Sequence, residues 1–357
     1  MEINRLSEAK RLLTNTGCSH LLISDLTDVE YISGFRSSNA AAIISKRKAL
    51  ILSDFRYKEA ADLFCKKNPD WKFVLVKERF FSTVAKFIPE GSTLGYQSDF
   101  LTVDNFNDLK KSLKKVSFKS VSKEISGLYL KKNQYELDCM SEAAAIGDKA
   151  LKKLLSAIKP GITEIELTRK LERYCCDLGS EKQSFDTIML FGKRSALPHG
   201  KPQDIALKKG DWILIDFGCT VDGFCSDMTR TFVYGKASPL HKEIYGIVKE
   251  AQMLARKAAR AGMSSRELDA IARTFIEKKG YGKNFGHALG HGVGLRIHER
   301  PRVSPHVDEI LEENCVVTIE PGIYIADFGG VRIEDTVILK KDGAPVITNF
   351  TKDLIEL

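Results

Sequence analysis

The sequence lacks the features that would place the protein in a membrane or outside the cell. None of its apolar runs approaches the roughly 20 residues that a membrane-spanning helix needs. The first residues, MEINRLSEAKRLL, are charged and amphipathic and lack the apolar core of a signal peptide. The eight cysteines are scattered and never form a CxxC pair, which is typical of a reduced protein. We therefore expect a cytoplasmic protein without a membrane partner.

The sequence also lacks a motif for binding nucleic acid. Its net charge of +8 is modest, and basic runs such as those at residues 46–48 and 110–115 contain no aromatic residues. Solvated helix faces explain such runs without a nucleic-acid partner. Histidine is scarce, with seven residues in the chain, so the positions of the histidines are informative.

The chain length and the apolar pattern predict two domains. At 357 residues the chain is longer than one average domain. Its early part alternates the short apolar runs HLLIS, AAAIIS, ALILS and KFVLV with a helical pattern in FRYKEAADLFCKK. Further on, Asn133 and Glu136 form the capping signature of a long amphipathic helix whose apolar positions continue to Ile158. We expect an α+β protein with a small α/β domain at residues 1–128 and a second domain at residues 129–357.

A predicted hairpin in the second domain, WILIDFGCTVDGFCSDMTR at residues 212–230, carries two acids. Its Asp-Gly pair at 222–223 suits a two-residue turn, because glycine supplies the positive φ that the turn needs. With this turn, Asp216 lies opposite Thr229, and Asp227 is its diagonal neighbour on the same face. Diagonal neighbours are about 7–8 Å apart at the backbone, so both carboxylates can reach one small cation. The alternative is that Asp227 is a solvated turn acid and Asp216 caps a loop.

The helices around this hairpin have counterparts later in the chain. Segments 161–179 and 262–280 each begin with a Thr/Ser-x-x-Glu capping box and end on a glycine suited to a left-handed cap. Each is followed by a ten-residue segment with a polar turn, an apolar strand and a final acid. The second domain is therefore expected to contain two similar halves that face each other about an approximate twofold axis.

The acids of the hairpin are repeated as well. LKKGDWILID, ending at Asp216, matches LEENCVVTIE, ending at Glu320, and GFCSD, ending at Asp227, matches GVRIE, ending at Glu334. The two acids are 11 residues apart in the first copy and 14 in the second. An odd difference would turn one acid to the opposite face of a strand. We therefore expect a bulge or a wider loop near residues 321–322.

Four carboxylates in one partly buried site indicate bound cations. Ionised carboxylates repel one another and lose solvation on burial unless positive charge compensates them. Arg230 and Arg332 are too few to do so, whereas two divalent ions supply four positive charges. Oxygen-dominated ligation with one imidazole favours Mn²⁺, Co²⁺, Fe²⁺ or Zn²⁺ over a soft-metal site.

Four of the seven histidines lie in motifs near these acids. His199 occurs in LPHGKP, and His287, His291 and His298 occur in GHALGHGVGLRIHERP. A single histidine is more often a surface or core residue, but three within twelve positions beside a carboxylate site indicate a function. The remaining histidines, at positions 20, 241 and 306, have no such context, and we expect no role for them.

Several motifs together resemble one protein family. They are PHG at 198–200, IDFG and SDMTRTF within 215–232, GHGVGL at 290–295, IHERP at 297–301, IEPGIY at 319–324 and GGVRIEDTV at 329–337. In order and number they resemble the pita-bread metallopeptidases. DVEYISGFRSSNAA and LSDFRYKEAA resemble the creatinase-type N-terminal domain of the proline-specific branch, which comprises Xaa-Pro dipeptidase, or prolidase, and aminopeptidase P. The resemblance implies a pita-bread fold for residues 129–357, preceded by a creatinase-type domain.

The resemblance also implies residue roles. The implied metal ligands are Asp216, Asp227, His291, Glu320 and Glu334. Two divalent ions are expected, with manganese as the expected metal and cobalt, iron or zinc as alternatives. A water or hydroxide held between the ions would attack the Xaa-Pro bond. The implied catalytic residues are Glu320, which carries the proton, with His199 and His298; the implied substrate-binding residues are His199, His287, His298 and Arg332.

The expected function is therefore hydrolysis of the bond before a proline in second position, in dipeptides or in longer peptides. The sequence leaves the substrate length open. Proline has no N–H and a fixed ring, so its recognition requires a dedicated pocket. Alternatives are a methionine aminopeptidase and a metal-free relative that acts as a binding protein or a creatinase-like hydrolase. A homodimer is expected, as in the proteins that the chain resembles.

Overall fold

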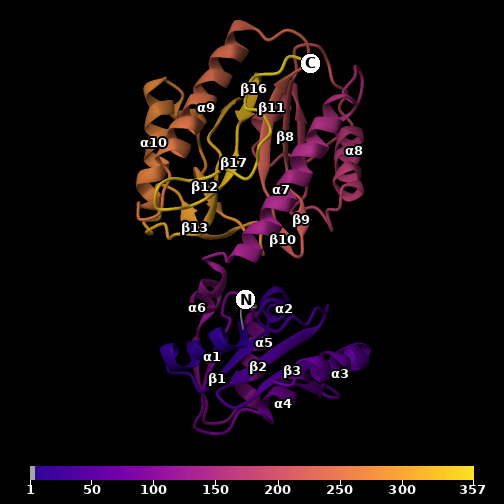
Figure 1. Cartoon of the computed structure of the whole chain (residues 1–357), viewed down its shortest axis with the longest axis vertical. Helices are drawn as coiled ribbons and strands as arrows, with labels where there is room; N and C mark the ends of the chain where they lie inside the picture. Colours follow the sequence, from indigo (N-terminus) through magenta and orange to yellow (C-terminus); the bar gives the residue numbers. More distant parts are fainter. Residues whose placement is uncertain (1–4) are drawn as a thin grey trace. The chain divides into compact units, whose positions relative to one another are not determined.

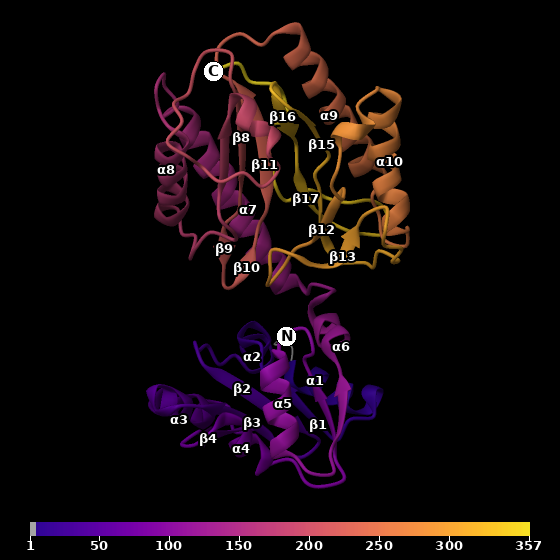
Figure 2. The same cartoon turned by 180° about the vertical axis from the view of Figure 1, so that it is seen from behind.

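The computed structural model describes residues 5–357, which form two compact units that meet between Leu128 and Tyr129 in the sequence. Within the described part of the chain, no helix is long and apolar enough to cross a membrane. All eight cysteines are free, and six of them are buried. The helices and strands of each unit are shown in Figures 1 and 2.

The first unit is built on a six-stranded sheet in the order β4-β3-β2-β1-β5-β6. The strands are β1 (His20–Ile23), β2 (Ala40–Ser45), β3 (Ala49–Ser53), β4 (Trp71–Leu75), β5 (Thr93–Tyr96) and β6 (Ser117–Ser120). The helices are α1 (Arg5–Thr16), α2 (Leu26–Ser33), α3 (Lys58–Lys67), α4 (Phe80–Ala85), α5 (Val103–Ser112) and α6 (Ser122–Ser126). The four apolar runs and the helical pattern of the sequence correspond to β1, β2, β3, β4 and α3.

Both faces of this sheet are buried, because successive side chains of a strand point to opposite faces. Ile23, Ala42 and Ile51 face the core formed with α1, α2 and α3. Leu22 and Ile43 face the other core, against α4 and α5. A strand that is buried on both sides has a continuous run of apolar residues. For this reason β1, β2 and β3 could be predicted from the sequence.

The second unit contains two halves of similar construction. Its helices are α7 (Gln134–Leu155), α8 (Glu164–Asp177), α9 (Pro239–Ala258) and α10 (Ser265–Lys278). Its strands are β7 (Ile188–Phe191), β8 (Trp212–Phe217), β9 (Thr220–Val221), β10 (Phe224–Cys225), β11 (Met228–Val233), β12 (Gly290–Gly292), β13 (Glu299–Val303), β14 (Val316–Ile319), β15 (Gly322–Ile325), β16 (Gly329–Arg332) and β17 (Asp335–Ile338). In both views α7 and α8 flank one side of the strands, and α9 and α10 flank the other (Figures 1 and 2).

The helix signals of the sequence are present in the second unit. Capping boxes begin α7, α8 and α10 at the predicted residues, and α9 has a further one. Helix α7 ends at Leu155, earlier than the apolar pattern suggested, because residues 156–158 form a tighter turn. Each half has its own core, formed by α7 and α8 against β7, β8 and β11, and by α9 and α10 against β13, β14 and β17.

The first hairpin has the predicted register. Asp216 pairs with Thr229, and Val221 pairs with Phe224 around the turn. Asp222 and Gly223 have φ angles of 46° and 79°, as a two-residue turn of this type requires. A Cβ atom on Gly218 would lie 1.9 Å from the carbonyl oxygen of Ser226, so only glycine fits where the hairpin passes Asp227. Asp216 and Asp227 are therefore diagonal neighbours.

The second hairpin corrects the prediction of a bulge near residues 321–322. Ile319 pairs with Asp335 before this point and Gly322 pairs with Arg332 after it, in one unbroken register. The three-residue turn at the tip, where Ile325 pairs with Gly329 and Asp327 has a φ of 63°, accounts for one of the three extra residues, and the other two place the second acid directly opposite the first. As a result Glu320 and Glu334 lie directly opposite each other instead of diagonally.

Candidate metal centre

The second unit contains a cavity of about 940 Å³. Its wall is formed by segments from both halves, including the ends of the two acid-bearing hairpins. All nine residues that the sequence assigned to the site line this one cavity: His199, Asp216, Asp227, His287, His291, His298, Glu320, Arg332 and Glu334. The fold thus brings together residues that are up to 135 positions apart in the chain.

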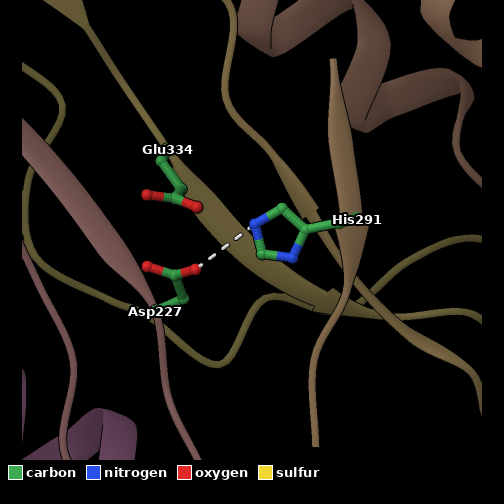
Figure 3. A group of neighbouring side chains, drawn as sticks. All are labelled: Asp227, His291 and Glu334. Carbon is green, nitrogen blue, oxygen red and sulfur yellow. Dashed lines mark ion pairs between the residues drawn. The ribbon is translucent and has the colours of Figure 1, made fainter. Parts of the chain in front are cut away.

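Three of these residues form a cluster that can hold a metal ion. One ligand atom from each of Asp227, His291 and Glu334 lies within 4.8 Å of the others. Figure 3 shows the two carboxylates and the imidazole pointing toward one another from separate strands. Asp227 precedes β11, His291 lies on β12, and Glu334 lies between β16 and β17. The donor set contains two oxygens and one nitrogen, which suits a divalent transition metal.

The His291 ring is oriented toward the carboxylates. Its Nδ1 lies 3.1 Å from the carbonyl oxygen of Gly292, which fixes the proton on Nδ1. Its Nε2 lies 3.3 Å from Glu320 Oε1 and 3.6 Å from Asp227 Oδ2. The lone pair of Nε2 is therefore free to bind a cation between these acids.

Asp216 provides a test of whether a cation fits the site. Arg332 Nη2 donates to Asp216 Oδ2 at 2.5 Å. The other oxygen, Oδ1, is buried and accepts no hydrogen bond from any of residues 5–357. A buried carboxylate oxygen without a partner is costly, and a cation in the cavity would satisfy it. The residues therefore fit a metal centre that extends from the Asp227 cluster to Asp216.

Two threonines hold the carboxylates in place. Thr229 Oγ1 donates to Glu334 Oε2 at 2.7 Å, and Thr318 Oγ1 donates to Glu320 Oε1 at 3.0 Å. Sequence reasoning did not single out either residue. The available signal was spacing, because each threonine is two residues from an acid and so lies on the same face of its strand. Such partners fix the orientation of metal ligands.

Burial and mutual repulsion strongly shift the titration of this site. Burial raises the pKa of Asp227 and Glu334 well above their usual values, and the neighbouring carboxylates raise both further. Burial also raises the pKa of Glu320 to about 8, although Arg332 opposes this change. Burial lowers the pKa of His291 to about 3, which keeps its imidazole neutral. A bound cation would reverse the first three shifts, because it favours ionised carboxylates.

These shifts predict a pH-dependent gain in stability from metal. The folded-state pKa of Glu320, about 8, is above its ordinary value of 4.5. Its contribution to the stability of the metal-free protein is therefore complete below pH 4.5 and is lost as the pH rises through about 8. We expect the difference in Tm between the Mn²⁺-loaded and the chelated protein to increase between pH 6.5 and 8. Differential scanning calorimetry of both forms measures it.

The range from pH 6.5 to 8 lies above the pKa values of His287 and His291. Burial lowers the pKa of His287 to about 4 and that of His291 to about 3, so these two residues are already neutral at pH 6.5, and burial also lowers the pKa of His298. Glu320→Gln is the matched control and should reduce the pH dependence, since an amide does not titrate. A Tm difference that stayed constant or decreased over this range would contradict the assignment.

Three histidines line the part of the cavity beside the acids. His199 and His298 are exposed, and the ring of His298 lies 4.4 Å from that of His291. His287 is more enclosed: its Nε2 lies 3.0 Å from the hydroxyl of Tyr324, and its Nδ1 lies 2.8 Å from the carbonyl oxygen of Ala288. The exposed imidazoles are therefore available to a ligand, whereas His287 is held by the protein.

A further residue of the site, Tyr324, was not recognised from the sequence. Its hydroxyl accepts from Arg332 Nη1 at 2.7 Å and contacts His287 Nε2. Arg332 also donates through Nε to Thr229 Oγ1 at 3.0 Å, and its side chain is 3% exposed. Arg332 therefore connects Asp216 to Tyr324 and His287. The resemblance implied a substrate-binding role for Arg332, whereas these contacts are made to a carboxylate and a hydroxyl of the protein itself.

His20, His241, His306 and Arg230, for which no metal or substrate role was expected, do not line the cavity. His241 accepts from the backbone N–H of Ser238 in the capping box of α9, while His20 and His306 do not line the cavity. Arg230 is buried and pairs with Asp335 at 2.9 Å, and it makes no ion pair with the four acids in the described part of the chain. Among the arginines of residues 5–357, Arg332 is the one that pairs with these acids, through Asp216 and Glu320.

Comparisons with known proteins agree with the fold. The model of metallopeptidase family M24 matches residues 138–341, and that of the creatinase/prolidase N-terminal domain matches residues 5–128. The chain is 37% identical over 355 residues to the Xaa-Pro dipeptidase of Pyrococcus furiosus, covering 98% of this chain and 99% of that protein.

Solved structures give the same result over nearly the whole chain. An Xaa-Pro dipeptidase from Bacillus anthracis has a TM-score of 0.93 at 37% identity, with 99% of each chain covered. An X-Pro aminopeptidase from Thermotoga maritima has a TM-score of 0.91 at 34% identity, again with 99% of each chain covered. The predicted pita-bread fold and the preceding creatinase-type domain are confirmed. The chain belongs to metallopeptidase family M24 and carries the creatinase/prolidase N-terminal domain.

Proposed function

We propose that the protein is a two-metal exopeptidase that hydrolyses the bond between an N-terminal residue and a following proline. The observation that carries the proposal is the convergence of the nine assigned residues on one cavity, with Asp227, His291 and Glu334 close enough to share an ion. Relatives of nearly the same length are named for action on Xaa-Pro substrates, which supports this substrate class.

The four acids and His291 would hold two divalent ions. Asp227, His291 and Glu334, whose ligand atoms lie within 4.8 Å of one another, would hold an ion together, and Asp216 and Glu320 would complete the set of ligands. The pair of ions would supply a water activated for attack near neutral pH and would polarise the scissile carbonyl. The manganese preference and the homodimer expected from the sequence belong to the same proposal.

Glu320 is the proposed proton carrier. Its carboxylate is buried, faces His291 Nε2 and is held through Oε1 by the Thr318 hydroxyl. With metal bound it would be ionised, would accept the proton of the attacking water on a carboxylate oxygen, and would pass a proton to the leaving proline nitrogen. Such general acid–base catalysis contributes about 100- to 10,000-fold to rate.

The histidines on the cavity wall are assigned to the substrate. His199 and His298 present exposed imidazoles that can donate to the carbonyl oxygen as its negative charge develops. His287 is held by Tyr324 and Ala288, so its ring forms a fixed wall of the substrate pocket. Arg332 orients Asp216 and Tyr324, and in this way it couples the metal ligands to that wall.

Two other functions are less well supported. A methionine aminopeptidase would act on peptides without proline, but the named relatives that span both units are Xaa-Pro enzymes. A metal-free binding protein would not need Asp216 Oδ1 to be buried without a partner in the protein. Dipeptidase and aminopeptidase activity are both included in the proposal, because relatives of both names match the chain equally well in length.

A substrate comparison tests the proposal. The Mn²⁺-loaded enzyme is assayed with Xaa-Pro dipeptides, with Xaa-Pro-Yaa peptides and with a methionyl peptide that lacks proline. We expect cleavage of one or both proline-containing classes and none of the methionyl peptide, measured by release of the N-terminal amino acid. Cleavage of the methionyl peptide alone would favour methionine aminopeptidase and reject the Xaa-Pro assignment.

A further inference from the structure

A buried ion pair joins Glu299, which lines the cavity, to Lys132, which does not. Lys132 Nζ and Glu299 Oε2 are 2.7 Å apart, and their side chains are 1% and 2% exposed. Lys132 Nζ also donates to the carbonyl oxygen of Tyr129 at 2.7 Å. Neither residue is among the proposed metal ligands or proton carriers, although Glu299 directly follows His298 in the IHERP motif. A fully buried lysine is rare unless it is paired, so the pair calls for an explanation.

The pair organises the loop at residues 294–299. Glu299 Oε1 accepts from the backbone N–H of Arg296 at 2.9 Å, and Glu299 Oε2 accepts from Lys132 Nζ. The carboxylate thus connects the loop backbone to Lys132. The guanidinium of Arg296 donates to the hydroxyl of Tyr129 at 2.7 Å. Residues 129 and 132 thus hold both ends of this turn.

Gly294 shows how closely the loop is fitted to the pair. A Cβ atom at this position would lie 2.6 Å from Glu299 Oε2 and 2.6 Å from Lys132 Cε. The carbonyl oxygen of Gly294 accepts from the N–H of Cys225 at 2.7 Å, which is two residues before Asp227. This hydrogen bond joins the loop to the hairpin that carries Asp227.

His298 depends on this loop for its position. Its side chain is exposed at the cavity wall, and its ring contacts that of His291 at a centroid distance of 4.4 Å. The His298 ring makes no hydrogen bond to any of residues 5–357, so its position depends on the backbone on either side and on the contact with the His291 ring. Glu299 is the next residue, and its carboxylate is fixed by Lys132.

We propose that Lys132 and Glu299 are positioning residues that place the His298 imidazole against the substrate. The inference rests on the proposed function, in which His298 stabilises the reacting carbonyl. A displacement of about 1 Å can reduce turnover about 100-fold. Lys132, which does not line the cavity, would then influence the rate through Glu299.

Removing both charges together is the appropriate test. Removing one partner leaves a buried unpaired charge and is strongly destabilising, whereas replacing both by apolar side chains is often neutral. We expect Lys132→Met/Glu299→Met to bind as much Mn²⁺ as the wild type and to lose about 100-fold in kcat. Lys131→Met is the matched control, since this neighbouring lysine is 58% exposed and pairs with Glu312 at the surface. It should leave kcat unchanged.

The decisive measurement repeats the double change in a His298→Ala background. If the pair acts through His298, the loss in kcat there should be less than about threefold. Hydrogen exchange of residues 293–299 gives a readout that does not depend on activity, and it should become faster in the double variant. An unchanged kcat with faster exchange, or an equal loss in both backgrounds, overturns the proposal.

Two further results keep the inference separate from the proposed function. Should the double variant be unstable, Glu299→Gln serves in its place, because its amide oxygen still accepts from Arg296 N–H while the ion pair is lost. Its kcat should fall in the same direction, and an unchanged kcat would overturn the inference. A wild-type enzyme that fails to cleave any Xaa-Pro peptide would reject the proposed function itself, and that result is seen before any variant is compared.

Discussion

Replacing Asp227 by asparagine should reduce Mn²⁺-dependent turnover to the level of the chelated protein and lower the bound metal below two ions per chain. Asp227 lies in the cluster with His291 and Glu334, and an amide is a far weaker ligand than a carboxylate. Loss of a direct ligand should exceed the roughly 10- to 100-fold effect of losing an outer partner. Steady-state kinetics and metal analysis of the purified variant measure both quantities.

The fold of this variant should remain intact. Burial and Glu334 raise the pKa of Asp227 well above its usual value, so the metal-free site favours an uncharged side chain at this position. The Tm of the chelated variant should therefore equal or exceed that of the chelated wild type. Asp222→Asn, at the tip of the same hairpin, is the matched control and should keep full activity. Near-normal turnover of Asp227→Asn would remove this residue from the ligand set.

The second large effect is expected for His298→Ala. Removing a donor to a developing negative charge typically costs about 100- to 1000-fold in kcat. His298 contacts the ring of His291 but is not in the metal cluster, so the bound metal should be nearly unchanged. Measuring kcat and metal content on the same preparation separates the two effects.

His306→Ala is the matched control for this substitution. His306 is exposed and does not line the cavity, and its loss should change neither quantity. If His298→Ala lost metal and turnover in equal proportion, His298 would instead be a ligand or a structural residue. The Lys132 inference would then lose its basis as well.

Local signals in the sequence were sufficient for much of the fold. The Asp-Gly pair at 222–223 determined the turn and therefore the register that makes Asp216 and Asp227 diagonal neighbours. Capping boxes located the starts of three helices, and continuous apolar runs located β1 to β4. The polar strands β5 and β6 were not recognised, because short segments such as SFKS at 117–120 carry little apolar pattern.

The supporting contacts of the site could not be read from the sequence. Thr229, Tyr324 and Lys132 act through residues that are 8 to 167 positions away, and only the folded chain brings them together. The extra residues of the second hairpin were placed near 321–322, because spacing gives a difference in length but not its location. Glu320 lies opposite Glu334 because the register is unbroken from Ile319 to the three-residue turn at the tip of the hairpin.

The two halves of the second unit have the shape of a duplicated segment whose copies have diverged unequally. Each copy still provides two acids from one hairpin, but the imidazole of His291, the guanidinium of Arg332 and the hydroxyl of Tyr324 come from the later copy alone. The earlier copy could therefore be preserved for holding charge while the later one changed in chemistry. With the acids provided by both copies and these further groups by the later one, a change in substrate preference could arise in the later copy without loss of the shared acids.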